Sequence, residues 1–224
     1  MSTILAIDTS TENAIVCMSD NRNLIDVIEN REQKNHASWL QSAVNLLLKK
    51  NGKSLSQLDA VSVTIGPGSY NGLRVGLSAA KGYCYALKIP LIGLSTLEVM
   101  AHSVKEKARE WICPMIDARR MEVFMAIYDS ELKEQVAPLA MILHRDYFVS
   151  LLKDHHILFC GNGSEKLKPI IDNQGGSFIG VDNLALSLIT LAENGLKKKK
   201  FSDIAFTEPK YLKDFHSSPK PGSD

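Results

Sequence analysis

The sequence has few cysteines and no paired ones. Its four cysteines are Cys17, Cys84, Cys113 and Cys160, and no two of them form a CxxC pair. This scatter argues against a zinc site and is typical of reduced thiols. We therefore expect a cytoplasmic protein without structural disulfides.

Long apolar segments are also missing. The longest uncharged apolar run, Leu184–Ala192, has the length of a helix in a protein core and is too short to span a bilayer. The amino-terminal string MSTILAIDTST has no basic region and reaches Asp8 before a long apolar segment forms. That pattern is unlike a secretory signal. The sequence thus predicts no membrane association.

Charge of one sign is not in excess, because 26 Lys and Arg residues oppose 25 Asp and Glu residues. No global field attracts nucleic acid or an anionic membrane, although a local basic patch is compatible with this balance. With 45% hydrophobic and 23% charged residues in 224, the composition is that of a globular protein. The length allows one large domain or two small ones.

Residues 1–105 are expected to form the first of two units. Three short apolar runs predict an antiparallel meander, and they lie at residues 4–7, 14–18 and 24–29. A helix is expected next, from His36 to Lys50, and it is followed by a strand at 60–65 and a helix at 73–87. A strand at 89–94 comes after these, and the capping box STLE at 95–98 opens a further helix. This order predicts parallel strands added to the meander.

Residues 106–224 are expected to form the second unit. Its predicted strands lie at 112–116, 123–128, 136–143 and 157–160. Three helices are predicted: one at 146–153, one that follows the loop GNGSE, and one at 181–194 that ends at Gly195. Both units place strands first and helices afterwards, which suggests a duplicated fold. The lysine run 197–200 and the polar tail HSSPKPGSD are predicted to be solvated and mobile.

The string IGPGSYNGLRVG at residues 65–76 carries four glycines between an apolar run and a helical pattern. A strand, a glycine-rich turn and a helix amino terminus form a general anion site, because the amides are exposed and the helix dipole adds positive charge. The candidate phosphate contacts are Gly66, Gly68, Ser69, Gly72 and Arg74. The string is neither a Walker A loop nor a dinucleotide fingerprint, so a tight packing turn is the alternative.

A second constellation is the string AIDTST at residues 6–11. Asp8 follows the first strand, and Thr9 and Ser10 begin a run of three hydroxyl residues. Together they can hold a hydrated cation and phosphate oxygens. The alternative is a local turn in which these side chains bond to neighbouring backbone.

Taken together, several strings resemble one family, the TsaB (YeaZ) proteins. The strings are ILAIDTST, NHAS, IGPGSYNGLRVGLSAAKG, IDARRMEV and EPKYL, and they occur in the family's order over nearly the whole chain. The glycine-rich string is the most specific of them. The resemblance implies an α/β fold of the actin/Hsp70-like (ASKHA) class, with two ribonuclease-H-like lobes built on mixed sheets flanked by helices.

The resemblance also implies a function. The family works in making N6-threonylcarbamoyladenosine at position 37 of tRNAs that read ANN codons, where TsaB is a non-catalytic scaffold subunit. The partners it implies are a TsaD-like paralogue, which carries the metal and transfers the group, a TsaE-like ATPase, and tRNA through the complex. A homodimer is implied for the isolated chain. ATP or ADP is expected at the interface with a partner, and no cofactor is expected on this chain itself.

The residues around the first helix bear on catalysis. TsaD-like proteins place two histidines four residues apart on a helix, so that both imidazoles reach one metal. This chain has His36, but Leu40 stands four residues later. A single imidazole beside an alkyl side chain is not a metal site, and we expect neither a metal nor a catalytic residue.

Two enzymatic alternatives are kept. An ATP-dependent phosphotransferase on the same fold would use Asp8 and the glycine-rich turn, but no second acidic phosphate motif is evident. Asp117, Arg119 and Glu122 resemble a hinge cluster of ion pairs more than a catalytic set. A metallopeptidase, an activity named in the wider family, would need a metal site.

We expect the helices 36–50 and 73–87 to form a partner surface. Its predicted contacts are Leu40, Val44, Leu47, Leu73, Val75, Leu77, Ala80 and Tyr83. The second helix carries more than one apolar or small-residue stripe, which indicates cover on two sides. The alternative is that both helices simply cover the sheet.

Two positions depart from the family pattern. Asn71 stands where threonine is usual, and Lys213 stands where arginine is typical and lacks its bidentate fork. A carboxylate or phosphate clamp at Lys213 is therefore in doubt. The lysine run 197–200 is compatible with contact to tRNA phosphates, and a solvated helix end is the alternative.

Overall fold

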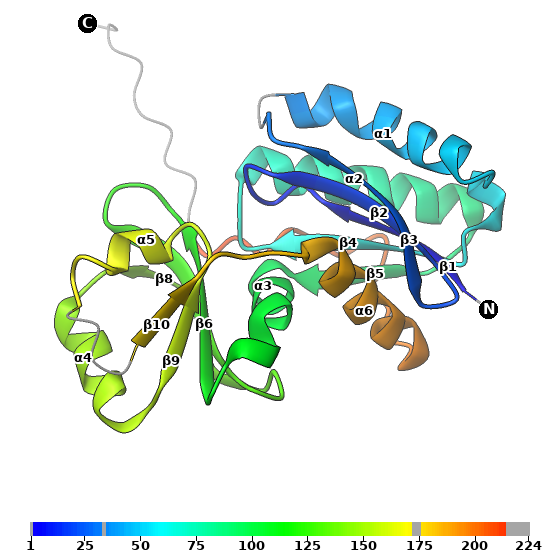
Figure 1. The fold of residues 1–224 in the computed structure, drawn as a ribbon. Coiled ribbons are helices and arrows are strands. Elements are labelled where there is room, and N and C mark those ends of the chain that lie inside the picture. The colour runs from blue at the N-terminus through cyan, green and yellow to red at the C-terminus, as the bar shows by residue number, and fades with distance from the viewer. Residues whose placement is uncertain (1, 33–34, 172–175, 214–224) are drawn as a thin grey trace, which may run out of the picture.

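The computed structural model describes residues 2–32, 35–171 and 176–213, and these form two lobes, each built on a five-stranded sheet (Figure 1). The polar tail expected beyond residue 213 lies outside the described residues. In the part of the chain that is described, no helix has the length and apolar character needed to cross a membrane.

The sheet of the first lobe confirms the predicted meander and the parallel additions. Its strands are β1 (Thr3–Asp8), β2 (Ala14–Asp20), β3 (Asn23–Asn30), β4 (Ala60–Gly66) and β5 (Leu91–Ser95), in the order β3-β2-β1-β4-β5. β1, β2 and β3 pair antiparallel, whereas β4 and β5 run parallel to β1. β1 and β4 are buried along their whole length, as near-continuous apolar runs require.

Helices cover both faces of this sheet (Figure 1). α1 (His36–Lys50) and α2 (Tyr70–Leu87) pack on one face over a core that includes Leu5 and Val63. α6 (Leu184–Lys197) packs on the other face, over Ile4 and its neighbours. A short 3-10 helix, η2 (Leu55–Gln57), links α1 to β4.

The sheet of the second lobe repeats the topology of the first. Its strands are β6 (Trp111–Asp117), β7 (Glu122–Asp129), β8 (Glu134–Ile142), β9 (Ile157–Cys160) and β10 (Gly176–Ile179), in the order β10-β9-β6-β7-β8. In each lobe the first three strands form a meander, and the fourth and fifth add in parallel beside the first. The duplicated two-lobe α/β fold is therefore confirmed.

Two helices lie between the sheets. α3 (Thr96–Val104), continued by the 3-10 helix η3 (Lys105–Lys107), leaves the first sheet and packs on the second, and α6 packs on the first. The two helices touch, and His102 Nδ1 lies 2.9 Å from Ser187 Oγ. The outer face of the second sheet carries the remaining helices, which are α4 (Arg145–Asp154) and α5 (Ser164–Leu167). Residues 184–197, counted with the second unit in the sequence, thus lie on the first sheet.

Several element bounds differ from the prediction. α2 begins at Tyr70 and not at residue 73, because Ser69 caps it by accepting a hydrogen bond from the Gly72 amide at 3.3 Å. Gly195 does not end the last helix. It lies inside α6, where a Cβ would come within 2.9 Å of Ile92 Cγ2, so the glycine permits close packing on β5. Strand β10 was not predicted.

The lysine run at the end of α6 is exposed, as predicted, but it forms a defined turn and not a mobile tail. The amide of Lys198 donates to the Asn194 carbonyl at 3.0 Å, and the amide of Lys200 donates to the Gly195 carbonyl at 2.9 Å. Lys199 adopts a left-handed backbone with φ +53°. This is the hydrogen-bonding pattern with which many helices end.

Residues 201–213, here called the C-terminal segment, return along the first lobe. The Ser202 amide donates to the Leu91 carbonyl at 2.8 Å, which covers the edge strand β5. Further along, the Lys210 amide donates to the Ile65 carbonyl at 2.6 Å. The segment therefore runs from the edge strand β5 to the carboxyl end of β4.

Candidate functional site

The glycine-rich turn joins β4 to α2, and the hairpin between β1 and β2 lies directly against it. A Cβ at Gly68 would come closer than 3.0 Å to Ser10, and a Cβ at Gly72 or Gly76 would come equally close to Thr9. The Ser69 amide donates to the Ser10 carbonyl at 2.7 Å, and Thr9 Oγ1 donates to the Gly72 carbonyl at 2.7 Å. The glycines therefore make room for the chain's own hairpin.

Several amides at the amino terminus of α2 form hydrogen bonds within the chain. Besides the Ser69 amide, which bonds to the hairpin, the Gly72 amide bonds to Ser69 Oγ and the Leu73 amide bonds to the Ser69 carbonyl at 2.9 Å. Gly66 has a φ of +116°, and its neighbour is the C-terminal segment. A Cβ at this position would lie 2.7 Å from the Lys210 carbonyl oxygen, so only glycine fits here. The hairpin and the C-terminal segment thus occupy the space beside these glycines.

Asp8 is buried, and one of its two carboxylate oxygens is held by three hydrogen bonds. Its Oδ1 accepts hydrogen bonds from the Ser10 amide at 2.9 Å, from Ser10 Oγ at 2.6 Å and from Thr64 Oγ1 at 2.7 Å. Only 2% of the residue is exposed. The carboxylate fastens the end of β1 to the hairpin and to β4, which is the local-turn alternative of the sequence analysis.

Arg74 points along the outside of the first lobe. Its guanidinium lies 3.9 Å from the centroid of the Tyr70 ring, and its Nε donates to the Tyr211 hydroxyl at 2.9 Å. The rings of Tyr70 and Tyr211 stack with centroids 4.8 Å apart. The hydrogen bond to Tyr211 raises the pKa of the Arg74 guanidinium. Arg74 therefore anchors the C-terminal segment on α2 and lies apart from the cleft lining.

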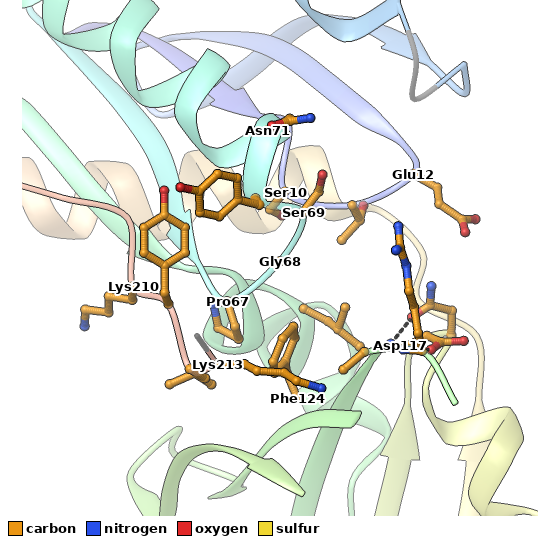
Figure 2. Close-up of a pocket in the computed structure, with 18 of the residues that line it drawn as sticks. Ser10, Glu12, Pro67, Gly68, Ser69, Asn71, Asp117, Phe124, Lys210 and Lys213 are labelled. Atoms are coloured by element: carbon orange, nitrogen blue, oxygen red, sulfur yellow. Dashed lines mark hydrogen bonds between the residues drawn. The ribbon is translucent and has the colours of Figure 1, made fainter. Parts of the chain in front are cut away.

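A cleft of about 620 Å³ opens between the lobes (Figure 2). Figure 2 shows Ser10, Ser69 and Asn71 on one side and Asp117 and Phe124 on the other. The lining comes from the β1–β2 hairpin, the glycine-rich turn, the β6–β7 loop, the loop after β9 and the C-terminal segment. Three of the eight predicted nucleotide contacts line it, namely Ser10, Gly68 and Ser69. The other five are Asp8, Thr9, Gly66, Gly72 and Arg74.

Two ion pairs stand at the second-lobe side of the cleft. Asp117 Oδ1 lies 2.5 Å from Lys166 Nζ, and Glu122 pairs with Lys213 of the C-terminal segment. Partial burial opposes ionisation of Asp117, but Lys166 and the Arg119 amide outweigh it, so the net pKa of Asp117 is lowered. The acidic residues thus form ion pairs, and Lys213 ties the C-terminal segment to the second lobe.

His36 stands without a second metal ligand beside it among the described residues. It is 3% exposed, and neither ring nitrogen has a hydrogen-bond partner among the described residues. Burial lowers the pKa of His36, so the imidazole is neutral near pH 7. In the described ranges no three His, Cys, Asp or Glu side chains are close enough to hold a metal ion. The donors present do not fit the two-histidine site of TsaD-like proteins.

The predicted partner contacts are mostly core residues. Leu40, Val44, Leu47, Leu73, Leu77 and Ala80 are all at most 4% exposed. The prediction that these six form a partner surface is wrong, because their stripes cover the sheet, as the alternative proposed. The other two, Val75 and Tyr83, are half-buried and face α1, where the Tyr83 hydroxyl donates to Gln41 Oε1 at 2.5 Å.

The positions that α1 and α2 leave to solvent are not among the partner contacts predicted in the sequence analysis. They include Leu46 on α1 and Ser78, Gly82, Tyr85 and Ala86 on α2. The signal was available, because these positions lie on the helix faces opposite the buried stripes. The role of the C-terminal segment could not be found in this way, because its partners are more than 100 residues away in sequence.

Comparisons with known proteins agree with this geometry. The model of the family described as "TsaD: tRNA N6-adenosine threonylcarbamoyltransferase" matches residues 26–218. The protein named tRNA threonylcarbamoyladenosine biosynthesis protein TsaB from Bacillus subtilis is 33% identical over 80% of this chain and 80% of its own length. The protein of the same name from Escherichia coli is 33% identical over 57% of this chain and 55% of its own length.

Solved structures define the class. YeaZ from Pseudomonas aeruginosa covers 95% of this chain and 100% of its own with a TM-score of 0.78 at 23% identity, which shows the shared fold. A putative N-acetylglucosamine kinase from Porphyromonas gingivalis covers 88% of this chain and 100% of its own at a TM-score of 0.50. The chain is thus a two-lobed α/β protein of the actin/Hsp70-like class. It belongs to the family that the matching model describes and, within it, to the TsaB (YeaZ) proteins.

Proposed function

We propose that this chain serves in the synthesis of N6-threonylcarbamoyladenosine at position 37 of ANN-reading tRNAs, as a non-catalytic subunit that docks to and activates a TsaD-like paralogue. The observation that carries the proposal is His36, a buried imidazole that is neutral near pH 7, with Leu40 where a second histidine would be needed. The TsaB names of the relatives supply the pathway.

The glycine-rich turn and Asp8 also support a subunit without chemistry of its own. Both belong to one hydrogen-bonded unit with Thr9 and Ser10, so the turn packs against protein and Asp8 Oδ1 is already engaged. A phosphotransferase would need these groups free to meet a nucleotide and its metal. We therefore place bound ATP or ADP at the interface with a partner and not on this chain alone.

The outward face of α1 and α2 around Leu46, Ser78, Gly82 and Ala86 is the proposed docking surface for the TsaD-like paralogue. A Cβ at Gly82 would meet no atom within 4 Å, so nothing inside this chain requires glycine there. A glycine inside a helix costs about 1 kcal/mol relative to alanine. Close approach of a helix from another chain would explain why the position lacks a side chain. The same face would serve the homodimer in isolation.

The experiment is to mix the purified chain with the TsaD-like and TsaE-like proteins of the same cell and to follow association by gel filtration with ATP present. The wild-type chain should form a defined complex, and Gly82→Leu should weaken it. Gly180→Leu is the matched control, because Gly180 is also exposed without neighbours but lies in the second lobe. Elution of the wild-type chain without either protein would refute the proposal.

Chemistry is tested separately in cells. Deletion of the gene should remove the modified nucleoside from tRNA, and a plasmid copy should restore it. A His36→Met copy should restore it equally, because the imidazole is a core residue in this proposal. Loss of the nucleoside with a folded His36→Met protein, or rapid ATP turnover by the isolated chain, would favour an enzyme.

A further inference from the structure

Exposed aromatic side chains gather on one part of the surface. Of the large hydrophobic side chains that are exposed in the described residues, four are aromatic: Tyr85 at 80%, Phe206 at 83%, Phe201 at 49% and Tyr211 at 41%. Tyr85 lies on α2 and the other three on the C-terminal segment, which runs beside this helix. Exposed aromatic groups that cluster mark a binding surface more often than a chance arrangement.

Cationic side chains lie on α2 beside the C-terminal segment and at the end of α6, where that segment begins. On α2, Arg74, Lys81, Tyr85 and Lys88 are spaced by seven, four and three residues, which puts them on one helical face. Lys81 Nζ donates to the Ala205 carbonyl at 3.4 Å, and Arg74 binds Tyr211, so this face adjoins the C-terminal segment at two points. The turn 197–200 brings four more exposed lysines immediately before Phe201.

These residues form a strip, defined as Arg74, Lys81, Tyr85 and Lys88 of α2 together with Lys197–Lys200, Phe201, Phe206 and Tyr211. Part of the strip follows α2, whose 18 residues are about 27 Å long, and the rest, Lys197–Lys200 and Phe201, lies at the end of α6 beside the edge strand β5. The acidic groups along it are Asp203 and Glu208, with Glu98 close enough to Lys200 to interact electrostatically. Cations are therefore in excess, although the whole chain is nearly neutral.

The backbone that carries the most exposed aromatic residue is fixed. Asp203 Oδ1 accepts hydrogen bonds from the Ala205 amide at 2.7 Å and from the Phe206 amide at 3.0 Å, and the Thr207 amide donates to the Asp203 carbonyl at 2.9 Å. The Phe206 ring is held outward by this turn. Arg74 is fixed in a similar way between Tyr70 and Tyr211. Pre-oriented groups lose little entropy on binding.

We propose that this strip binds single-stranded or loop RNA, with lysines on the phosphates and exposed rings stacked on bases. Lysine is depleted at protein–protein interfaces, whereas aromatic residues interleaved with cations are typical of single-strand binding. The planar Arg74 guanidinium suits a phosphate. That the RNA is the anticodon arm of a tRNA rests on the proposed function; that it is RNA with unpaired bases rests on the strip itself.

Stacking is tested by fluorescence anisotropy with a labelled anticodon stem-loop of an ANN-reading tRNA and the purified chain. Tyr85→Ala and Phe206→Ala should each weaken binding about fivefold or more, since each would remove one stacked base. Ile142→Ala is the matched control, because Ile142 is also exposed but belongs to the second lobe. Both rings are exposed, so unchanged melting temperatures should accompany the loss.

Phosphate contacts are tested by the salt dependence of the same binding. The triple variant Lys81→Gln, Lys198→Gln and Lys200→Gln should reduce the slope of log K against log salt by about 2, at roughly 0.7 for each contact to a single strand. It spares Lys88 and Lys199, whose left-handed backbone would complicate substitution. Lys107→Gln with Lys153→Gln, both far from the strip, should leave the slope unchanged.

Association with the TsaD-like protein separates the two proposals. If the complex forms and the strip variants weaken RNA binding, both proposals hold. A complex that forms while every strip variant binds RNA like wild type overturns the strip alone. Variants that lose the protein partner but keep RNA affinity would show that the strip is a protein interface, which also overturns it. RNA binding that depends on the strip without any complex would overturn only the proposed function.

Discussion

Thr9 and Gly72 face each other so closely that the Thr9 carbonyl oxygen fills the space a Cβ at Gly72 would need. The hydrogen bond from Thr9 Oγ1 to the Gly72 carbonyl fixes this arrangement. The pair explains why a turn with the composition of a phosphate loop serves as a packing surface. It also couples the β1–β2 hairpin to α2, the helix that carries both proposed binding surfaces.

Adding a methyl group at this contact should destabilise the protein. Gly72→Ala must displace backbone and not a flexible side chain, so we expect a loss of about 1–3 kcal/mol in the free energy of unfolding. Urea denaturation followed by circular dichroism measures it. Gly82→Ala is the control and should gain up to about 1 kcal/mol, because the site is open and helical. Equal stability of the two variants would contradict the packing described for Thr9.

Removal of a hydroxyl from the Asp8 network should also be costly. Thr64→Val keeps the shape of the side chain but takes one hydrogen bond from the buried carboxylate, so the free energy of unfolding should fall by about 1–3 kcal/mol. Thr190→Val, at an exposed hydroxyl on α6, should change it by less than about 0.5 kcal/mol. A neutral Thr64→Val would mean that the network contributes little to folding.

The buried imidazole of His36 should make stability depend on pH. Burial lowers the pKa of His36 in the folded state, so the unfolded chain binds the proton more readily. The stabilising contribution is full above the unfolded pKa of about 6.5 and is lost as the pH falls below it. Urea unfolding between about pH 7 and pH 5 should show this decline, and His36→Met should flatten it. His144→Gln, at an exposed histidine, should keep the wild-type profile.

The ion pair between Lys213 and Glu122 should hold the C-terminal segment against the second lobe. Its charges are partly solvated, so Lys213→Glu should cost less than about 1 kcal/mol in global stability. Hydrogen exchange of residues 202–213 should nevertheless accelerate, because the contact between segment and second lobe is lost. The double variant Lys213→Glu with Glu122→Lys should restore slow exchange, while Lys153→Glu should leave it unchanged. Fast exchange in the double variant would contradict the pairing.

Much of the fold was predictable because its determinants are local. The apolar runs at 4–7, 60–65 and 157–160 are long enough to form buried strands, and the helical period of 36–50 places its buried side chains on one face. The repeated order of strands and helices indicated two similar units. The prediction that Gly195 ends the last helix was wrong, because the role of this glycine depends on Ile92 of a strand distant in sequence.

The candidate site was less predictable. The sequence alone suggests a ligand site at Asp8, Ser10 and the glycine-rich turn. It suggests either a core or an interface for Leu40, Val44 and Leu47. Only the folded chain shows that the hairpin fills the turn and that these leucines and the valine cover the sheet. The C-terminal segment contacts α2 through residues that are far apart in the sequence. Arg74 and Tyr211, for example, are separated by 137 positions.

The sequence by itself determined the strands, the helices and the family, because periodicity, turn residues and motif strings are properties of neighbouring residues. It also determined that a second metal-binding histidine is missing after His36. The tertiary structure decided which glycines serve packing, which apolar stripes are buried, and that the C-terminal segment brings exposed aromatic rings to the side of α2. The reason is physical: steric exclusion, burial and the local excess of charge depend on distances in space, and the fold sets those distances between segments that the chain keeps far apart.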